Sequence, residues 1–281
     1  MVQKALTLPA DSLIFDLEDA VPIEKKADAR ATVTEWLKQL NFGQRERLVR
    51  INPLGTDYGE ADLEATIQGK PDGYVIPKPR RAADIQAVAA ILDRLEMLHG
   101  LPRGNMILLA IATETPEGLL NIAEIAKASP RLAALSWGME DLSAAMGISQ
   151  TRTGTGELLD LFRFARMMTL LAAAAAGIDA IDTVFTDIQN LDRLRVESLE
   201  AAQMGFAGKL SIHPSQIDVI NQAFNPSAAE VQEAEALIQA FEASRSKGQG
   251  AFSFRGQMVD APHLTRAKKL LERARLATGA R

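Results

Sequence analysis

Acidic side chains follow several short apolar runs of this sequence, at the point where each run ends. Glu114 follows residues 106–111, and Asp141 follows residues 132–137. Carboxylates that crowd into one partly buried site repel each other, and a divalent cation is the usual remedy. The chain has no cysteine and three histidines, so its carboxylates favour Mg²⁺ or Mn²⁺ over zinc. Glu114 and Asp141 are the candidate ligands, although each also stands where a first-turn acid would stabilise a helix.

More charged residues gather around the first two runs. Residues 12–17 include Asp16 and are followed directly by Glu18 and Asp19, while Arg50 interrupts the next apolar run. A charge inside an apolar strand is costly unless it is paired. Arg50 is therefore either a clamp for an anion or enolate in the site, or a structural ion pair with Glu18 or Asp19.

Other basic residues are weaker candidates. Lys78 would form a Schiff base only if it were desolvated, and its place between two prolines indicates an exposed lysine or a contact with a phosphate or carboxylate. His213 is expected to form hydrogen bonds at a strand end. Lys25, Lys26 and Arg30 open a predicted helix, where acids are preferred. They therefore either meet an anionic ligand or form a solvated face.

These residues are positioned by alternating strands and helices. Short, often continuously apolar runs are typical of strands buried on both faces. The predicted strands are residues 12–17, 47–51, 73–76, 106–111, 132–137, 180–185 and 210–213. The segments between them are amphipathic, so the chain reads as repeated parallel β/α units. In a parallel β/α barrel the active site lies at the carboxyl ends of the strands, where the acidic residues stand.

Composition excludes several classes of protein. The chain has 281 residues, 47% of them hydrophobic and 24% charged, with a net charge of −5. An acidic balance argues against nucleic acid as a partner, and the lack of cysteine excludes disulfides and cysteine nucleophiles. There is no apolar run of about 18 residues or more and no signal-peptide pattern. We therefore expect a cytoplasmic protein with no membrane partner.

The pattern changes after the seventh run. We expect a barrel domain over residues 1–226 and a C-terminal extension over residues 227–281. The extension begins with a polar-faced helix, followed by a flexible spacer at residues 246–250 and a small hairpin around Arg255 and Gly256. A final helix is predicted from about residue 262 to 277.

Seven motifs occur in an order that is informative as a set. They are FDLEDAV (15–21), VRIN (49–52), ETPEG (114–118), WGMEDL (137–142), GIDAIDTV (177–184), GFAGKLSIHPSQI (205–217) and GQMVDAP (256–262). The chain thereby resembles the citrate lyase beta-subunit family of the HpcH/HpaI aldolase and malyl-CoA/citramalyl-CoA lyase superfamily. The resemblance covers essentially the whole chain.

The resemblance implies a (β/α)₈ TIM barrel and Mg²⁺-dependent cleavage of a hydroxyacyl thioester, carried by CoA or an acyl carrier. By motif, Glu114 and Asp141 resemble the metal ligands, and Arg50 resembles the residue that contacts the substrate carbonyl or carboxylate. Glu18 and Asp19 resemble acids that hold Arg50 and metal-bound water.

The same resemblance gives roles to residues outside the acidic cluster. Asp260 is similar to a lid aspartate that reaches the site of a neighbouring subunit as a general acid or base, which implies a homo-oligomer, commonly a trimer. Lys25, Lys26 and Arg30 match basic positions that face the CoA phosphates.

One departure bears on activity. Relatives open with a strand of the type R-S-x-L-F-x-P-G, and this chain has no such strand, so its barrel is expected to lack the first strand and the arginine that this strand carries. A sheet with two unpaired edges is a liability.

Three functions remain: a carbon–carbon lyase acting on a citramalyl-CoA, malyl-CoA or citryl thioester, a malyl-CoA-type thioesterase, and a non-catalytic ligand-binding or assembly homologue.

Overall fold

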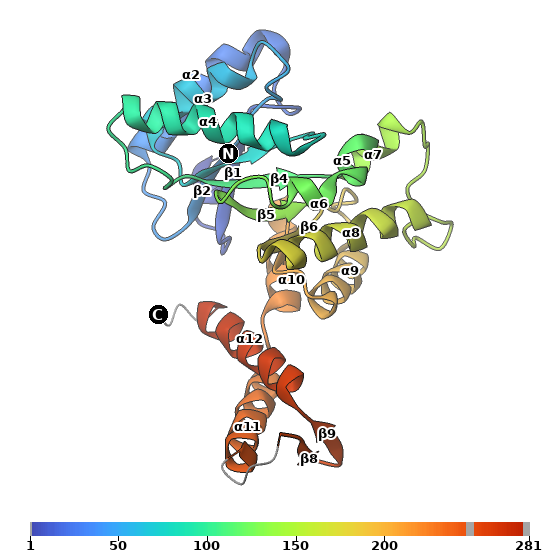
Figure 1. The fold of residues 1–281 in the computed structure, drawn as a ribbon. Helices are drawn as coiled ribbons and strands as arrows, with labels where there is room; N and C mark the ends of the chain where they lie inside the picture. Colours follow the sequence, from blue (N-terminus) through green and yellow to red (C-terminus); the bar gives the residue numbers. More distant parts are fainter. Residues whose placement is uncertain (1, 246–249, 278–281) are drawn as a thin grey trace. The chain divides into compact units, whose positions relative to one another are not determined.

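A computed structural model describes residues 2–245 and 250–277 (Figure 1). The chain forms two compact units, Met1–Asp218 and Val219–Arg281. The division falls inside α10 (Pro214–Phe224), earlier than the boundary expected after residue 226. Most of the predicted spacer, residues 246–249, lies outside the described residues.

The first unit contains a seven-stranded parallel sheet that curls into a half-barrel. The strands are β1 (Ser12–Asp16), β2 (Glu46–Arg50), β3 (Gly73–Ile76), β4 (Ile107–Ile111), β5 (Leu132–Ser136), β6 (Asp179–Asp182) and β7 (Gly208–Lys209). They are hydrogen-bonded in sequence order, which confirms the parallel β/α prediction. Within the described residues β1 and β7 are the two edges of the sheet, and no eighth strand lies between them.

Helices connect consecutive strands, as right-handed crossovers between neighbouring parallel strands require. α1 (Val2–Ala5) precedes β1. The connecting helices are α2 (Lys26–Gln39), α3 (Gly59–Thr66), α4 (Ala82–Leu98), α5 (Pro116–Leu120), α6 (Ile122–Ile125), α7 (Met139–Ala145), α8 (Asp160–Ala176) and α9 (Leu191–Met204). In Figure 1, α2, α3 and α4 lie together on one side of the sheet.

The continuous apolar runs are explained by burial on both faces of the sheet. All four residues of β3 are buried. One face of the central strands forms a cluster of Leu48, Val75, Leu109, Ile111 and Ala134. The alternate residues, such as Tyr74 and Leu108, are fully buried as well. A strand that is dry on both faces has no polar alternation to display.

Two predicted elements are wrong in detail. The seventh strand is β7 at Gly208–Lys209, not residues 210–213. The Gln216 side chain accepts a hydrogen bond from the Ile212 N–H (3.1 Å), and this contact turns the chain into α10 instead of extending the strand. The amphipathic segment after the fourth predicted strand is not one helix but two short helices, α5 and α6.

The second unit contains the predicted hairpin and final helix. α11 (Ala228–Arg245) precedes strands β8 (Phe252–Phe254) and β9 (Gln257–Val259), which pair antiparallel, and α12 (Ala261–Ala277) follows. Arg255 and Gly256 both have positive φ, 48° and 82°, as a two-residue hairpin turn of type I′ requires. No helix among residues 2–245 and 250–277 has the length and apolarity needed to cross a membrane.

Candidate active site

The carboxyl ends of five neighbouring strands bring charged residues to one rim of the half-barrel. Asp16 ends β1, Arg50 ends β2, Lys78 follows β3, and Glu114 follows β4. Asp141 lies in the first turn of α7, directly after β5. The sheet order β1-β2-β3-β4-β5 makes these positions consecutive along the rim, as the barrel prediction required.

Arg50 is held by two carboxylates. Its Nε donates to Asp16 Oδ1 (2.7 Å) and its Nη2 to Asp16 Oδ2 (2.6 Å), while Nη1 lies 3.2 Å from Glu18 Oε2. Burial alone would lower the pKa of Arg50, but these carboxylates raise it overall. The ion pair expected with Glu18 or Asp19 therefore exists with Glu18, and the stronger partner is Asp16, which the sequence alone did not single out.

Lys78 contacts all the acids of this rim named above except Asp16, and it also contacts Asp19. Its ammonium lies 2.7 Å from Glu18 Oε1, 3.0 Å from Asp19 Oδ2 and 3.2 Å from Asp141 Oδ1, and its backbone N–H donates to Glu114 Oε2 (2.7 Å). Only 25% of the side chain is exposed, so the expected solvated lysine is wrong and the carboxylate contact is confirmed.

The same contacts make Lys78 unsuitable as a Schiff-base lysine. Burial would lower the pKa of Lys78, but the hydrogen bond to Glu18 and the charges of Glu18 and Asp141 raise it overall. A Schiff base needs the neutral amine, and these carboxylates keep Lys78 protonated.

Glu114 is buried, with 3% of its surface exposed, the same fraction as Glu18. Burial raises the pKa of Glu114 to about 8, the Lys78 N–H opposes the rise, and the charges of Glu18 and Asp141 add to it. A carboxylate so placed is poised to take up a proton or a cation.

The alternative explanation, that Glu114 serves the following helix, is not supported. The N-cap of α5 is Thr115, whose hydroxyl accepts a hydrogen bond from the Gly118 N–H (3.0 Å), with Pro116 in the first turn. Glu114 instead packs against Gly138, where a Cβ atom would stand 2.3 Å from Glu114 Cγ. The absence of a side chain at Gly138 therefore makes room for Glu114.

Asp141 occupies the first-turn position that one explanation requires, and its role as a metal ligand stays a prediction. It lies in the first turn of α7, where an acid is favourable, and it also reaches Lys78 with 34% of its side chain exposed. Among the described residues no group of three or more His, Cys, Asp or Glu is arranged to hold a metal. Mg²⁺ commonly uses one or two carboxylates plus water and substrate oxygens, so Glu114 and Asp141 stay the predicted ligands.

The three predicted phosphate-binding residues occupy different environments. Lys25 is exposed, with 65% of its side chain open, and pairs weakly with Asp28. Lys26 is buried, and its ammonium donates to the carbonyl oxygens of Leu17 and Glu18, both at 2.9 Å. Lys26 therefore fastens the loop that carries Glu18, and its ammonium is not open to a phosphate.

Arg30 also has a protein partner. Its Nε lies 2.8 Å from Oδ1 of the fully buried Asp62. Asp62 in turn accepts from the Asn52 side chain (2.7 Å), which also donates to the Leu17 carbonyl (2.8 Å). Arg30 thus belongs to the network that supports the ends of β1 and β2.

Asp260 lies in the second unit, directly before α12. Its Oδ1 is 2.6 Å from His263 Nδ1. The role of Asp260 at the carboxylate cluster stays a prediction. His213 is exposed and its Nδ1 contacts the Ser215 hydroxyl (2.8 Å), as expected for a residue that bonds locally where the chain enters α10.

Asp182, at the end of β6, is a structural acid. It is buried and binds the Trp137 indole N–H (2.7 Å), the Lys209 ammonium (2.9 Å) and the Arg166 guanidinium (3.2 Å). Burial would raise the pKa of Asp182, but Lys209 and Arg166 lower it overall. Asp187, which follows on the same segment, is exposed.

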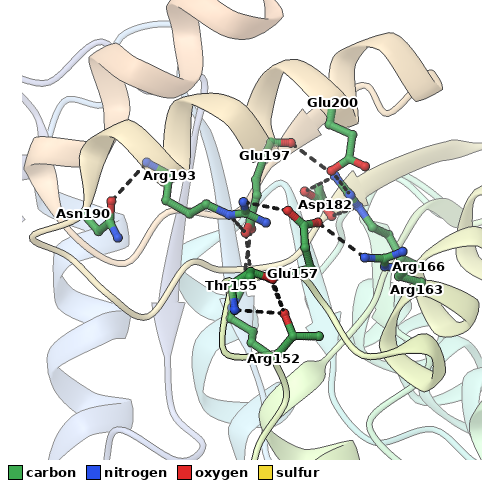
Figure 2. A network of polar contacts seen from close by, with 12 residues as sticks. Arg152, Thr155, Glu157, Arg163, Arg166, Asp182, Asn190, Arg193, Glu197 and Glu200 are labelled. Atoms are coloured by element: carbon green, nitrogen blue, oxygen red, sulfur yellow. Dashed lines mark hydrogen bonds and ion pairs between the residues drawn. The ribbon is translucent and has the colours of Figure 1, made fainter.

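An ion-pair network extends from Asp182 across the neighbouring helices (Figure 2). Arg152 and Arg193 both pair with Glu197, and Arg193 also pairs with Glu157 (3.1 Å). Glu197 lies on α9, whereas Arg152 and Glu157 lie in the segment before α8. The network therefore ties this segment to α9 and has a supporting role.

Comparisons with known proteins identify the family that the chain resembles. Residues 1–214 match the model of the family described as HpcH/HpaI aldolase/citrate lyase. A (3S)-malyl-CoA thioesterase from Cereibacter sphaeroides is 39% identical over 273 residues, which are 97% of this chain and 90% of the relative. The citrate lyase subunit beta of Escherichia coli is 38% identical over 277 residues, covering 99% and 90%.

Solved structures are similar over most of the chain. The crystal structure of the Mycobacterium tuberculosis protein CitE in complex with magnesium, acetoacetate and coenzyme A has a TM-score of 0.77 and 38% identity, covering 96% of this chain and 91% of that one. A citrate lyase beta subunit from the same organism, complexed with oxaloacetate and magnesium, has a TM-score of 0.67 and 35% identity, covering 79% and 89%. Given the matched family model, these identities and the shared fold, the chain is a member of the HpcH/HpaI aldolase/citrate lyase family.

Proposed function

We propose that this protein is a Mg²⁺-dependent carbon–carbon lyase that cleaves a hydroxyacyl thioester, of the malyl-CoA, citramalyl-CoA or citryl type, into an acetyl thioester and a keto acid. The observation that carries the proposal is the buried Glu114 beside Asp141, next to the Arg50 guanidinium. Magnesium in the similar CitE structures supports the same assignment.

Glu114 and Asp141 would hold the Mg²⁺, and the same oxygen ligands would accept Mn²⁺. The fit rests on the buried Glu114 carboxylate, whose pKa of about 8 indicates that a nearby positive charge is needed to keep it ionised. A bound divalent cation supplies Lewis-acid polarisation of the substrate hydroxyl and carboxylate.

Arg50 would stabilise the negative charge that develops on the departing thioester enolate. A guanidinium has five N–H donors, and the contacts to Asp16 and Glu18 use three of its nitrogens once each. Donors therefore remain for an oxyanion, while the two carboxylates fix the orientation of the group. A donor held in place before the reaction stabilises a transition state at no cost of reorganisation.

Glu18 and Asp19 would act through the cations they hold. Glu18 contacts both Arg50 and Lys78, and Asp19 contacts Lys78.

Of the three basic residues assigned to coenzyme A, Lys25 has the exposed ammonium and is the one proposed to meet a CoA phosphate. Lys26 and Arg30 would stabilise the loop after β1 and the strand ends that carry the site.

Asp260 would protonate the enolate carbon. It would reach the site from a neighbouring subunit of a trimer, whose hairpin-and-helix unit would act as a lid over that site. This proposal can be tested by mixing two inactive variants, Asp260→Asn and Glu114→Gln. If each site takes Asp260 from a neighbour, mixed oligomers contain some sites with both native residues and regain part of the activity. Mixtures that stay inactive after verified subunit exchange would place Asp260 in its own subunit's site or outside catalysis.

A thioesterase is the second candidate, because the Cereibacter sphaeroides relative named (3S)-malyl-CoA thioesterase is as similar to this chain as the citrate lyase beta subunits are. The purified chain should be incubated with Mg²⁺ and malyl-, citramalyl- and citryl-thioesters, and the products identified. A released keto acid with acetyl thioester indicates a lyase, whereas a free hydroxy acid with free thiol indicates hydrolysis. Turnover of none of them would favour the non-catalytic alternative.

A further inference from the structure

Lys78 occupies the centre of the acidic cluster. Three carboxylates, those of Glu18, Asp19 and Asp141, lie within 3.2 Å of its ammonium. Among the described residues, the other lysines that form ion pairs do so with different carboxylates. The ammonium thus already supplies positive charge at Asp141, one of the two proposed Mg²⁺ ligands.

The backbone and the side chain of Lys78 perform separate tasks. The backbone N–H binds Glu114 (2.7 Å), and the residue has a left-handed conformation with φ of 51°, which is uncommon for a residue other than glycine. This peptide contact does not depend on the side chain. The side chain is a compact charge on a flexible stem, so it can move while the N–H stays on Glu114.

The three ion pairs of Lys78 differ in length and in location. Glu18 is the nearest partner at 2.7 Å and is almost fully buried, whereas Asp141 is the farthest at 3.2 Å and is partly exposed. Glu18 and Asp19 lie together after β1, but Asp141 lies on α7. The ammonium can therefore release Asp141 and keep its two partners after β1.

We propose that Lys78 is a built-in counter-ion that holds Asp141 when the divalent cation is absent and competes with that cation for the Asp141 carboxylate. This inference rests on the proposed function, which places the cation at Glu114 and Asp141. When the cation arrives, the Lys78 ammonium withdraws towards Glu18 and Asp19. Lys78 thereby keeps the cluster folded without metal, and it weakens metal binding in return.

The test measures Mg²⁺ binding to the full chain after treatment with a chelator, by calorimetry and by the shift of the melting temperature with Mg²⁺. Lys78→Met removes the competing charge, so we expect Mg²⁺ to bind roughly tenfold more tightly than to the native chain, while the melting temperature without metal falls. Lys78→Gln, which keeps hydrogen bonding and protects folding, should shift the affinity in the same direction. Lys78→Arg retains the charge and should stay within about threefold of the native affinity.

Lys38→Met is the matched control. Lys38 lies on α2, and its ammonium forms a long ion pair of 3.7 Å with Glu35, away from the acidic cluster. Its loss should therefore leave Mg²⁺ affinity unchanged. Unchanged or weaker Mg²⁺ binding in both Lys78→Met and Lys78→Gln, with binding to the native chain intact, would overturn the competition while leaving the proposed function standing. If Mg²⁺ binds neither the native chain nor these variants, or if Glu114→Gln binds it as well as the native chain, the cation site itself is wrong and the inference falls with it.

Discussion

Arg50 donates two hydrogen bonds to Asp16, the residue directly opposite it in the register between β2 and β1. β1 and β2 pair in parallel, and Asp16 and Arg50 are the last residues of the two strands. Their side-chain contact fixes the guanidinium plane at the rim, with Glu18 as a further partner. Register, which sets which residues stand opposite each other, therefore orients the group assigned to the enolate.

The Arg50–Asp16 pair predicts a specific loss in Arg50→Lys. A lysine keeps the charge but cannot form the planar two-point contact, so we expect kcat to fall about 100-fold, the usual cost of one lost oxyanion donor. Arg47→Lys is the control, because Arg47 makes the same two-point contact with Asp72 at the opposite end of β2. Steady-state kinetics with the substrate found in the thioester screen decide the matter, and equal losses in both variants would contradict the assignment.

The pKa of Glu114 predicts a pH-dependent stability in the metal-free protein. Its pKa is about 8 in the folded chain and its ordinary value is 4.5, so between these values the folded state binds more protons than the unfolded state. The free energy of unfolding should therefore decrease as pH rises from about 4.5 to 8, by up to ~1.4 kcal/mol per pH unit.

Urea unfolding of chelator-treated protein at several pH values measures this dependence. Glu114→Gln cannot ionise and should lack this contribution, whereas Glu117→Gln, at an exposed position on α5, should keep it. A native chain and a Glu114→Gln variant with parallel pH profiles would show that Glu114 is not the titrating group.

The contact between Gly138 and Glu114 predicts a steric defect. In Gly138→Ala the new methyl group would meet Glu114 Cγ at 2.3 Å, so the carboxylate must move. We expect a loss of about 1–3 kcal/mol in stability and weaker Mg²⁺ binding. Gly154→Ala serves as the control, because a Cβ there has no neighbour within 4 Å, and its stability should change by no more than ~0.5 kcal/mol. Equal stability of the two variants would contradict the predicted clash.

Asp182 should be important for stability even though it is not proposed to act in catalysis. Asp182→Asn leaves the buried Lys209 and Arg166 without their shared carboxylate, and breaking a buried ion pair in this way costs about 3–5 kcal/mol. Asp187→Asn, at the exposed acid of the same segment, should change the free energy of unfolding by less than ~0.5 kcal/mol. Denaturant unfolding of both variants checks this, and a small effect of Asp182→Asn would show that water replaces the lost partner.

Much of the fold could be predicted because burial leaves a direct mark on the sequence. Strands that are dry on both faces appear as apolar runs, and the first six were located to within a few residues. The seventh was misplaced, because β7 has only two residues, Gly208 and Lys209. The Gln216 side chain binds the Ile212 N–H in the segment that was expected to be the strand. A strand so short carries no periodicity to recognise.

The sequence by itself determined which residue types end each strand, and therefore that Glu114, Asp141, Arg50 and the acids after β1 share one rim. Only the tertiary structure decided their partners. Lys78 lies between two prolines in the sequence, which left an exposed lysine and a phosphate or carboxylate contact both open, and the fold brings it to Glu18, Asp19, Asp141 and Glu114. These contacts join residues that are far apart in the chain, and their charges meet only when the strands are side by side. Local sequence patterns reflect burial and backbone preference, whereas an ion pair depends on distances that folding alone creates.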